Sequence, residues 1–132
     1  MSVFVDTSAF IALLDADDPN HDSAVGVWQD LLERDEALVC TNYVLVETSA
    51  LAQQRFGLAA VRTVHNIYVP ILSVAWLDAA SHGQAVTSLL TANRRNLSLV
   101  DCASFGTMRR LGISTAFAAD RHFREQGFRV LP

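Results

Sequence analysis

The chain has 132 residues, of which 51% are hydrophobic and 18% are charged, and its formal net charge is −4 at pH 7. This composition excludes a disordered chain, which would carry too little apolar surface to fold, and the length fits one domain over residues 1–132. No apolar run reaches the roughly 18 residues of a membrane-spanning helix and no secretory signal precedes the domain, so we expect a cytoplasmic protein with no membrane partner.

Short β-branched runs alternate with helical patterns along the chain. The helical patterns predict helices over Thr7–Leu14, His21–Arg34, Asn42–Phe56, Leu58–Tyr68, Asp78–Ala92 and Leu99–Leu111. The β-branched runs predict strands at Val3–Val5, Ala37–Thr41, Leu72–Val74 and Thr115–Ala118, with a fifth at Phe128–Leu131.

This alternation predicts right-handed crossovers and a largely parallel sheet covered on both faces, which is a three-layer α/β domain. Sites in such sheets form beyond the carboxyl ends of the strands, near the point where the strand order reverses. Asp6 ends the first predicted strand and Asp120 follows the fourth. Both acids can therefore lie at the edge where a site is expected.

Two further acids occupy positions where a charge is costly. Glu47 lies in "NYVLVETSALA", where apolar residues at helical spacing indicate a buried face, and Asp101 lies between Val100 and Cys102 in "LSLVDCASF". A carboxylate on a buried apolar face must be paired, bind a metal or take up a proton. These two acids are therefore also candidate ligands.

Helix capping is the simpler explanation for three of the four acids. Asp6 could cap the helix from Thr7, Asp120 could cap a short turn from Arg121, and Ser98 with Asp101 resembles a capping box. Taken singly, each of these acids fits capping as well as it fits ligand binding. Glu47 is in the middle of its helix, and capping does not account for four acids at one edge of a sheet.

The basic residues and the cysteines say less about function than the four acids do. All ten basic residues are Arg, including Arg94-Arg95 and Arg121, and they are either ordinary solvated surface or contacts to phosphate, which guanidinium groups bind well. Cys40 and Cys102 stand apart in apolar sequence, so we expect buried thiols in place of a disulfide or a zinc site.

Four segments resemble the successive motifs of PIN-domain ribonucleases, and specifically of the VapC toxins of bacterial and archaeal toxin–antitoxin pairs. They are "FVDTSAFIALLD", "TNYVLVETSA", "RRNLSLVDCASFGTMRRLGI" and "AFAADRHFREQGFRVL", and the resemblance runs from Val3 to Leu131. It implies an α/β/α PIN-like fold with a mainly parallel sheet of four or five strands. It also implies cleavage of RNA, leaving a 5′-phosphate and a 3′-hydroxyl.

Carried over residue by residue, the resemblance gives four metal-binding and catalytic acids, polar support from Thr7 or Ser8, and candidate RNA phosphate contacts. The four acids would be Asp6, Glu47, Asp101 and Asp120, and the phosphate contacts would be Arg94, Arg95 and Arg121. Asp120 matches a family position at which Asp, Asn and Ser all occur. The resemblance further implies a VapB-like antitoxin as partner.

A cluster of four carboxylates requires a cation on physical grounds. Two unit charges about 4 Å apart repel by about 4 kcal/mol at an effective dielectric constant of about 20. Ligand sets made only of oxygen suit Mg²⁺ or Mn²⁺, and no H-E-x-x-H spacing indicates zinc. Without the four acids, ten of the 14 acidic residues remain against ten Arg, so the net charge of −4 equals the charge of the cluster.

The resemblance also implies a homodimer that forms through "TSALAQQRFGLAAVRTVHNIYVPIL". An apolar stripe in this segment could form that interface or could cover the sheet of its own subunit. The stripe consists of Leu58, Val61, Val64, Ile67 and Tyr68.

Three other classes fit part of the pattern. A phosphoacceptor domain also has an Asp after its first strand, but the chain has no Lys for a receiver, and Ser8 stands where a D-x-D phosphatase has its second Asp. A non-catalytic binding module would use the acids only as caps. A PIN-domain nuclease of RNA processing would share the chemistry without a toxin role.

Overall fold

The fold is a five-stranded sheet in which every pair of neighbouring strands is parallel. The computed structural model describes all 132 residues, and the strands lie in the order β3-β2-β1-β4-β5. Their bounds are β1 Ser2–Val5, β2 Ala37–Thr41, β3 Ser73–Ala75, β4 Thr115–Phe117 and β5 Arg129–Leu131. The three-layer fold with a parallel sheet that we expected is confirmed.

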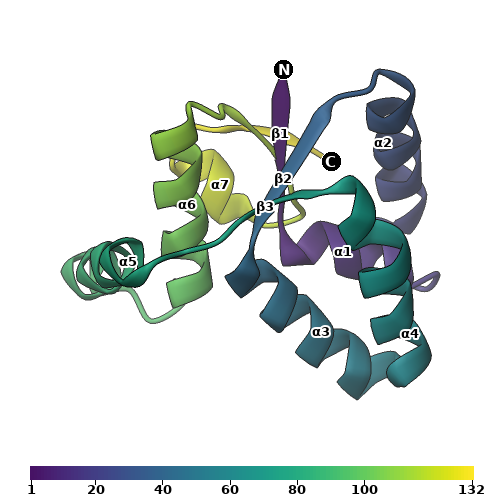
Figure 1. Ribbon diagram of the computed structural model, residues 1–132, viewed down its shortest axis with the longest axis horizontal. Helices are drawn as coiled ribbons and strands as arrows, with labels where there is room; N and C mark the ends of the chain where they lie inside the picture. Colours follow the sequence, from purple (N-terminus) through teal and green to yellow (C-terminus); the bar gives the residue numbers. More distant parts are fainter.

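Seven α-helices connect and cover the strands. They are α1 Thr7–Leu14, α2 His21–Glu33, α3 Asn42–Phe56, α4 Leu58–Thr63, α5 Ala79–Ala92, α6 Leu99–Leu111 and α7 Arg121–Glu125. Figure 1 shows α5, α6 and α7 on one side of β1 and β2, and α1, α2 and α4 on the other. None of the helices is both long enough and apolar enough to cross a membrane.

The strand order reverses between β1 and β4, and this determines where a site can form. From β1 the chain proceeds outward to β2 and β3, then returns across the sheet to β4 on the other side of β1. The helices after β1 and β4 therefore start next to each other at the carboxyl ends of two adjacent strands. Such a switch point is where open parallel sheets bind ligands.

The core surrounds the central strand β1. Val3, Phe4 and Val5 are completely buried, as expected for a strand in the middle of a parallel sheet covered on both faces. They belong to one contiguous cluster of 24 buried residues. Cys40 and Cys102 are in this cluster as free, buried thiols, which confirms that expectation.

The segment expected as one helix over Leu58–Tyr68 is instead three short pieces. Helix α4 ends at Thr63, a π-helix spans Val64–Tyr68, and a turn of 3-10 helix spans Val69–Ile71. Val64 is fully buried and the ring of Tyr68 stacks on Phe10. A π-helix carries an extra residue per turn, and composition alone does not indicate one. The remaining boundaries differ from those expected by one residue at most.

Candidate active site

Asp6 follows β1 and is the N-cap of α1. Its Oδ2 accepts hydrogen bonds from the amide of Ser8 at 3.1 Å and from the hydroxyl of Ser8 at 2.6 Å. The backbone amide of Asp6 donates to the carbonyl of Phe117, so the residue is fixed between β1 and β4. Asp6 is only 4% exposed.

Asp101 is in the first turn of α6, where it forms the expected capping box with Ser98. The Asp101 amide donates to Ser98 Oγ at 3.0 Å, and the Ser98 amide donates to Asp101 Oδ2 at 3.1 Å. This pair satisfies two amides that a helix start leaves without partners. Asp101 is 8% exposed, which confirms its expected burial.

Asp120 is the N-cap of α7, the short helix that follows β4. Its Oδ1 accepts a hydrogen bond of 2.9 Å from the amide of His122. Asp6, Asp101 and Asp120 therefore all cap helices, as the simpler explanation held. Each uses only one carboxylate oxygen for this, and the second oxygen has no hydrogen bond within the protein. The three acids can cap helices and bind a ligand at the same time.

Glu47 lies in the middle of α3 and makes no hydrogen bond or ion pair with its side chain. It is half-buried and Ala50 is exposed, so the fully buried face that we expected around Glu47 is wrong. Thr7 connects α1 to this helix, because its hydroxyl donates to the carbonyl of Val44 at 3.4 Å and accepts from the hydroxyl of Thr48 at 3.2 Å. Thr7 thus holds α1 against the part of α3 that contains Glu47. Ser8 orients the carboxylate of Asp6.

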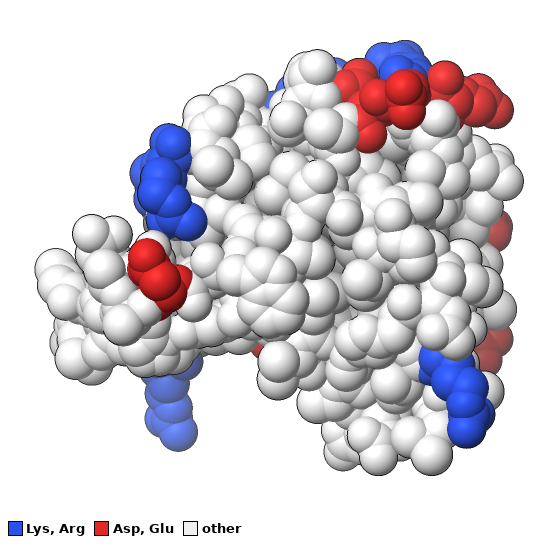
Figure 2. All heavy atoms as spheres, viewed as in Figure 1, with Lys and Arg blue, Asp and Glu red and all other residues white.

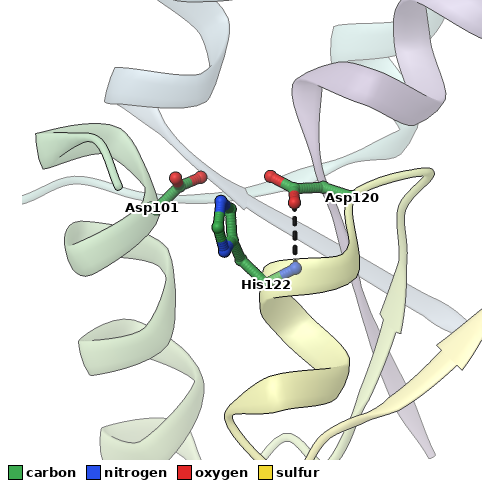
Figure 3. A group of neighbouring side chains, drawn as sticks. All are labelled: Asp101, Asp120 and His122. Atoms are coloured by element: carbon green, nitrogen blue, oxygen red, sulfur yellow. Dashed lines mark hydrogen bonds between the residues drawn. The ribbon is translucent and has the colours of Figure 1, made fainter. Parts of the chain in front are cut away.

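An open cleft of about 410 Å³ brings all four acids together at the switch point of the sheet. Ser98 and Leu51 also line it, as do Thr7 and Ser8. Oxygens of Asp101 and Asp120 lie within 4.8 Å of each other and of a nitrogen of His122 (Figure 3). Asp6 and Glu47 lie in the same cleft, outside this close group.

No salt bridge neutralises the four acids of the cleft. Burial raises the pKa of Asp6 to about 6, the two hydrogen bonds from Ser8 oppose this rise, and the charges of Asp101 and Glu47 add to it. Burial also raises the pKa of Asp101, and the charge of Asp120 adds to that rise. The donor set, acidic oxygens that form no salt bridge, fits a hard divalent metal ion.

Of the three predicted arginines, only Arg121 lines a hollow next to the cleft. Arg94 pairs with Glu125 at 3.1 Å, and Arg95 lines neither the cleft nor the hollow beside it. Arg121 lines that hollow of about 220 Å³ together with Arg124, and the hollow adjoins the cleft at Ala119 and Asp120. Arg55, which we did not single out, lines the cleft itself.

Two other residues at the site also escaped the sequence analysis. Asp18 lines the cleft from the loop before α2. His122 lies between Asp101 and Asp120 in Figure 3. His122 follows the candidate acid Asp120 by two positions, and this nearness was a signal in the sequence. The helix that contains it, α7, has only five residues, which is too short for periodicity to show that the ring is buried. For Arg55 the signal was its spacing, because it follows Glu47 by two turns of α3.

Comparison with known proteins assigns the family. The family model of the PIN domain matches residues 3–129. The chain belongs to the PIN-domain family. Within that family it is 35% identical, over 127 residues, to the protein named 23S rRNA-specific endonuclease VapC20 in two strains of Mycobacterium tuberculosis, covering 96% of this chain and 95% of the relative. The resemblance to VapC proteins is thereby confirmed, as is the expected class of enzyme, a metal-dependent nuclease.

Solved structures agree with this assignment. The crystal structure of M. tuberculosis VapC20, described as a toxin that cleaves the sarcin–ricin loop, superposes with a TM-score of 0.82 at 33% identity over 96% of this chain and 95% of that chain. FitAcB from Neisseria gonorrhoeae gives a TM-score of 0.72 at 15% identity over 100% of this chain and 97% of that one. VapBC2 from Rickettsia felis, bound to a DNA fragment from its promoter, gives 0.70 at 13% identity over 98% and 97%. These last two share the fold.

Proposed function

We propose that this protein is an endoribonuclease that hydrolyses RNA phosphodiester bonds with Mg²⁺ or Mn²⁺ and acts as the toxin of a toxin–antitoxin pair. One observation carries the proposal. Four acids from four separate elements converge in one cleft, and the three that cap helices each leave one oxygen without a hydrogen bond in the protein. Capping alone does not require that convergence.

Asp6, Glu47, Asp101 and Asp120 would hold one or two cations through these oxygens. When bound, a divalent cation neutralises the carboxylates and activates water towards the phosphorus atom. Ser8 and Ser98 orient Asp6 and Asp101 before any ligand arrives, because each serine bonds one oxygen of its acid. Less reorganisation is then needed when substrate enters the cleft.

Arginines on two sides of the cleft would bind the RNA backbone. Arg55 lies at the C-terminal end of α3, and Arg121 with Arg124 lines the adjoining hollow next to Asp120. A strand that crosses the acids would meet a guanidinium on either side. Such contacts position the strand without reading its sequence.

The substrate that the relatives favour is ribosomal RNA. The 35% identical relative is named for its 23S rRNA specificity. The direct test is to incubate the purified protein with a sarcin–ricin hairpin, a tRNA and an unstructured RNA, with Mg²⁺, Mn²⁺ or chelator. We expect cleavage of the hairpin only with metal, and none by Asp101→Asn. Cleavage that survives chelation would contradict the mechanism, and equal cleavage of all three RNAs would contradict the substrate.

We further propose an antitoxin that blocks the acidic cleft, on the strength of membership in the VapC group. A partner that places an Arg among the acids would compete with metal for them. Mn²⁺ affinity should therefore fall when the purified pair is compared with the free protein. An unchanged Mn²⁺ affinity would show that the partner inhibits without entering the cleft.

A homodimer would use the face that carries β3. Figure 2, in the view of Figure 1, shows this face almost free of Lys, Arg, Asp and Glu, which lie at its margin. Trp76 after β3 is 73% exposed, and Ile67 in the π-helix is 61% exposed. Within the predicted apolar stripe, Val64 is buried in the core of its own subunit. Leu58 and Ile67 are exposed and could contribute to an interface. Large exposed apolar side chains on a face with few charges are typical of a protein interface.

A further inference from the structure

His122 occupies the space between two acids of the cleft. Its ring lies between the carboxylates of Asp101 and Asp120 (Figure 3), and it is 7% exposed. Histidines that are this deeply buried are held by hydrogen bonds, and the partners of this ring come from two different elements.

Each ring nitrogen faces an oxygen atom. Nδ1 lies 3.3 Å from Oε2 of Glu125, within the same short helix α7. Nε2 lies 3.2 Å from the carbonyl oxygen of Asn96, in the loop before α6. Both nitrogens thus lie within hydrogen-bond distance of protein oxygens. Coordination of a cation by the ring would therefore break one of these two contacts.

The contact with Asn96 links the supports of two acids. Asn96 is two residues before Ser98, which forms the capping box with Asp101. The amide of His122 donates to Asp120 Oδ1 at 2.9 Å. One residue thus contacts Asp120 through its backbone and the loop that leads to Asp101 through its ring. The other polar link between α7 and this loop is the exposed ion pair Arg94–Glu125.

We propose that His122 is a positioning residue: its hydrogen bond to the carbonyl of Asn96 sets the separation of Asp101 and Asp120 and thereby the affinity of the cleft for a divalent cation. The proposal rests on the metal-dependent nuclease proposed above. Residues that orient ligands in this way typically contribute about 10–100-fold to metal affinity.

Two amide substitutions separate the two ring contacts. His122→Gln places a donor near the position of Nε2 and can keep the bond to Asn96. His122→Asn places its amide near Nδ1, so it can reach Glu125 but not Asn96. A matched control is His21→Gln, because Nδ1 of His21 also bonds a backbone carbonyl, that of Ala12, at 2.7 Å and outside the cleft, and the amide of Gln lies near Nε2 and loses this bond.

The measurements are Mn²⁺ affinity from the electron paramagnetic resonance signal of free Mn²⁺, and melting temperature without metal. We expect His122→Asn to weaken Mn²⁺ binding about tenfold, while His122→Gln and His21→Gln bind Mn²⁺ like the wild type. A purely structural role would instead lower affinity in step with melting temperature in all three variants, and that result would overturn the proposal. So would wild-type affinity in His122→Asn.

Pulsed electron paramagnetic resonance of bound Mn²⁺ tests the remaining alternative. We expect no coupling to a directly coordinated ¹⁴N in the wild type, whereas such a coupling, lost in His122→Asn, would make His122 a ligand and overturn the positioning role. If the wild type binds Mn²⁺ but cleaves no RNA, the proposed function fails and the affinities still decide the role of His122. If it binds no Mn²⁺, both proposals fail.

Discussion

The amide of Ala119 donates a hydrogen bond of 2.9 Å to the hydroxyl of Ser8, although 111 positions separate the two residues in the chain. The same hydroxyl donates to Asp6 Oδ2 at 2.6 Å. Ser8 therefore connects the first acid of the cleft to the loop that carries Asp120. This small side chain joins the two halves of the sheet at the switch point.

Replacing Ser8 tests this connection. In Ser8→Ala, Asp6 loses one hydrogen bond to its charged form, so its pKa rises further and metal binding requires a higher pH. We expect RNA cleavage to fall about tenfold or more, with a stability loss of only about 1 kcal/mol. Ser8→Thr keeps the hydroxyl and is the control. The measurement is cleavage rate against pH, and a Ser8→Ala profile that matches the wild type would contradict the role.

Amide substitutions of the buried acids should separate stability from activity. Asn can still cap where Asp6 and Asp101 cap, so Asp6→Asn and Asp101→Asn keep their helix starts while removing a buried charge. We expect both variants to melt at a higher temperature than the wild type without metal, to gain nothing from Mg²⁺ or Mn²⁺, and to cut no RNA.

Thermal melting with and without metal checks this expectation. Metal at about 100 times its Kd should stabilise the wild type by about 2.7 kcal/mol. The control is Asp30→Asn, which removes an exposed acid paired with Arg34. Variants of Asp6 and Asp101 that melt like the wild type and still gain from metal would return these acids to capping alone.

The metal-free protein should lose stability as pH rises towards neutrality. The pKa of Asp6 is about 6 when folded against 3.8 when unfolded, so the folded state holds the proton more tightly. Its contribution is complete below pH 3.8 and disappears as pH rises through about 6. A difference of about two pKa units corresponds to roughly 3 kcal/mol. Asp101 acts in the same direction.

This dependence is measured as the difference between the wild type and Asp6→Asn. In chelator, the unfolding free energy of the variant should exceed that of the wild type by more at pH 7 than at pH 4.5. The comparison cancels groups that titrate in both proteins. A difference that is constant with pH would show that Asp6 is ionised throughout this range.

Arg55 is expected to bind RNA. Removing one guanidinium–phosphate contact weakens binding uniformly across sequences and lowers the slope of log affinity against log salt by about 1. Arg55→Ala should therefore raise the KM for RNA, and this rise should be smaller at high salt than at low salt. The control is Arg129→Ala, because Arg129 begins β5 and lies at the opposite edge of the sheet. Equal effects of the two substitutions would indicate a general loss of charge.

Trp76 is expected to lie in the homodimer interface. Trp76→Ser should shift the sedimentation coefficient towards that of a monomer at micromolar concentration, because it removes a large, 73% exposed apolar side chain that follows β3. Leu90→Ser is the control, since Leu90 in α5 is 72% exposed as well. A wild type that is monomeric at the same concentration would exclude this dimer.

The sequence predicted most of the architecture because alternation of strands and helices constrains topology strongly. Periodicity located the helices, and the strand ends brought Asp6 and Asp120 to one edge. The π-helix at Val64–Tyr68 was missed because it depends on tertiary contacts with Phe10 and the core. Spacing along α3 did contain the signal for Arg55, since Glu47, Leu51 and Arg55 are four residues apart and all line the cleft.

Other parts of the site could not be predicted from local sequence. A charge pair such as Arg94-Arg95 does not show which side of a loop it occupies, and here Arg94 pairs with Glu125 on the surface. The role of His122 depends on the carbonyl of Asn96, 26 positions away. Contacts of this kind become visible only when the fold brings the two segments together.

The double use of Asp6, Asp101 and Asp120 as caps and as candidate ligands has a genetic consequence. An aspartate codon becomes an asparagine codon by one base change, and asparagine caps a helix as well as aspartate does. A single mutation can thus silence the nuclease while the protein still folds. Cells under selection by the proposed toxin should therefore yield inactive copies in one step, and these copies should still accumulate as folded protein.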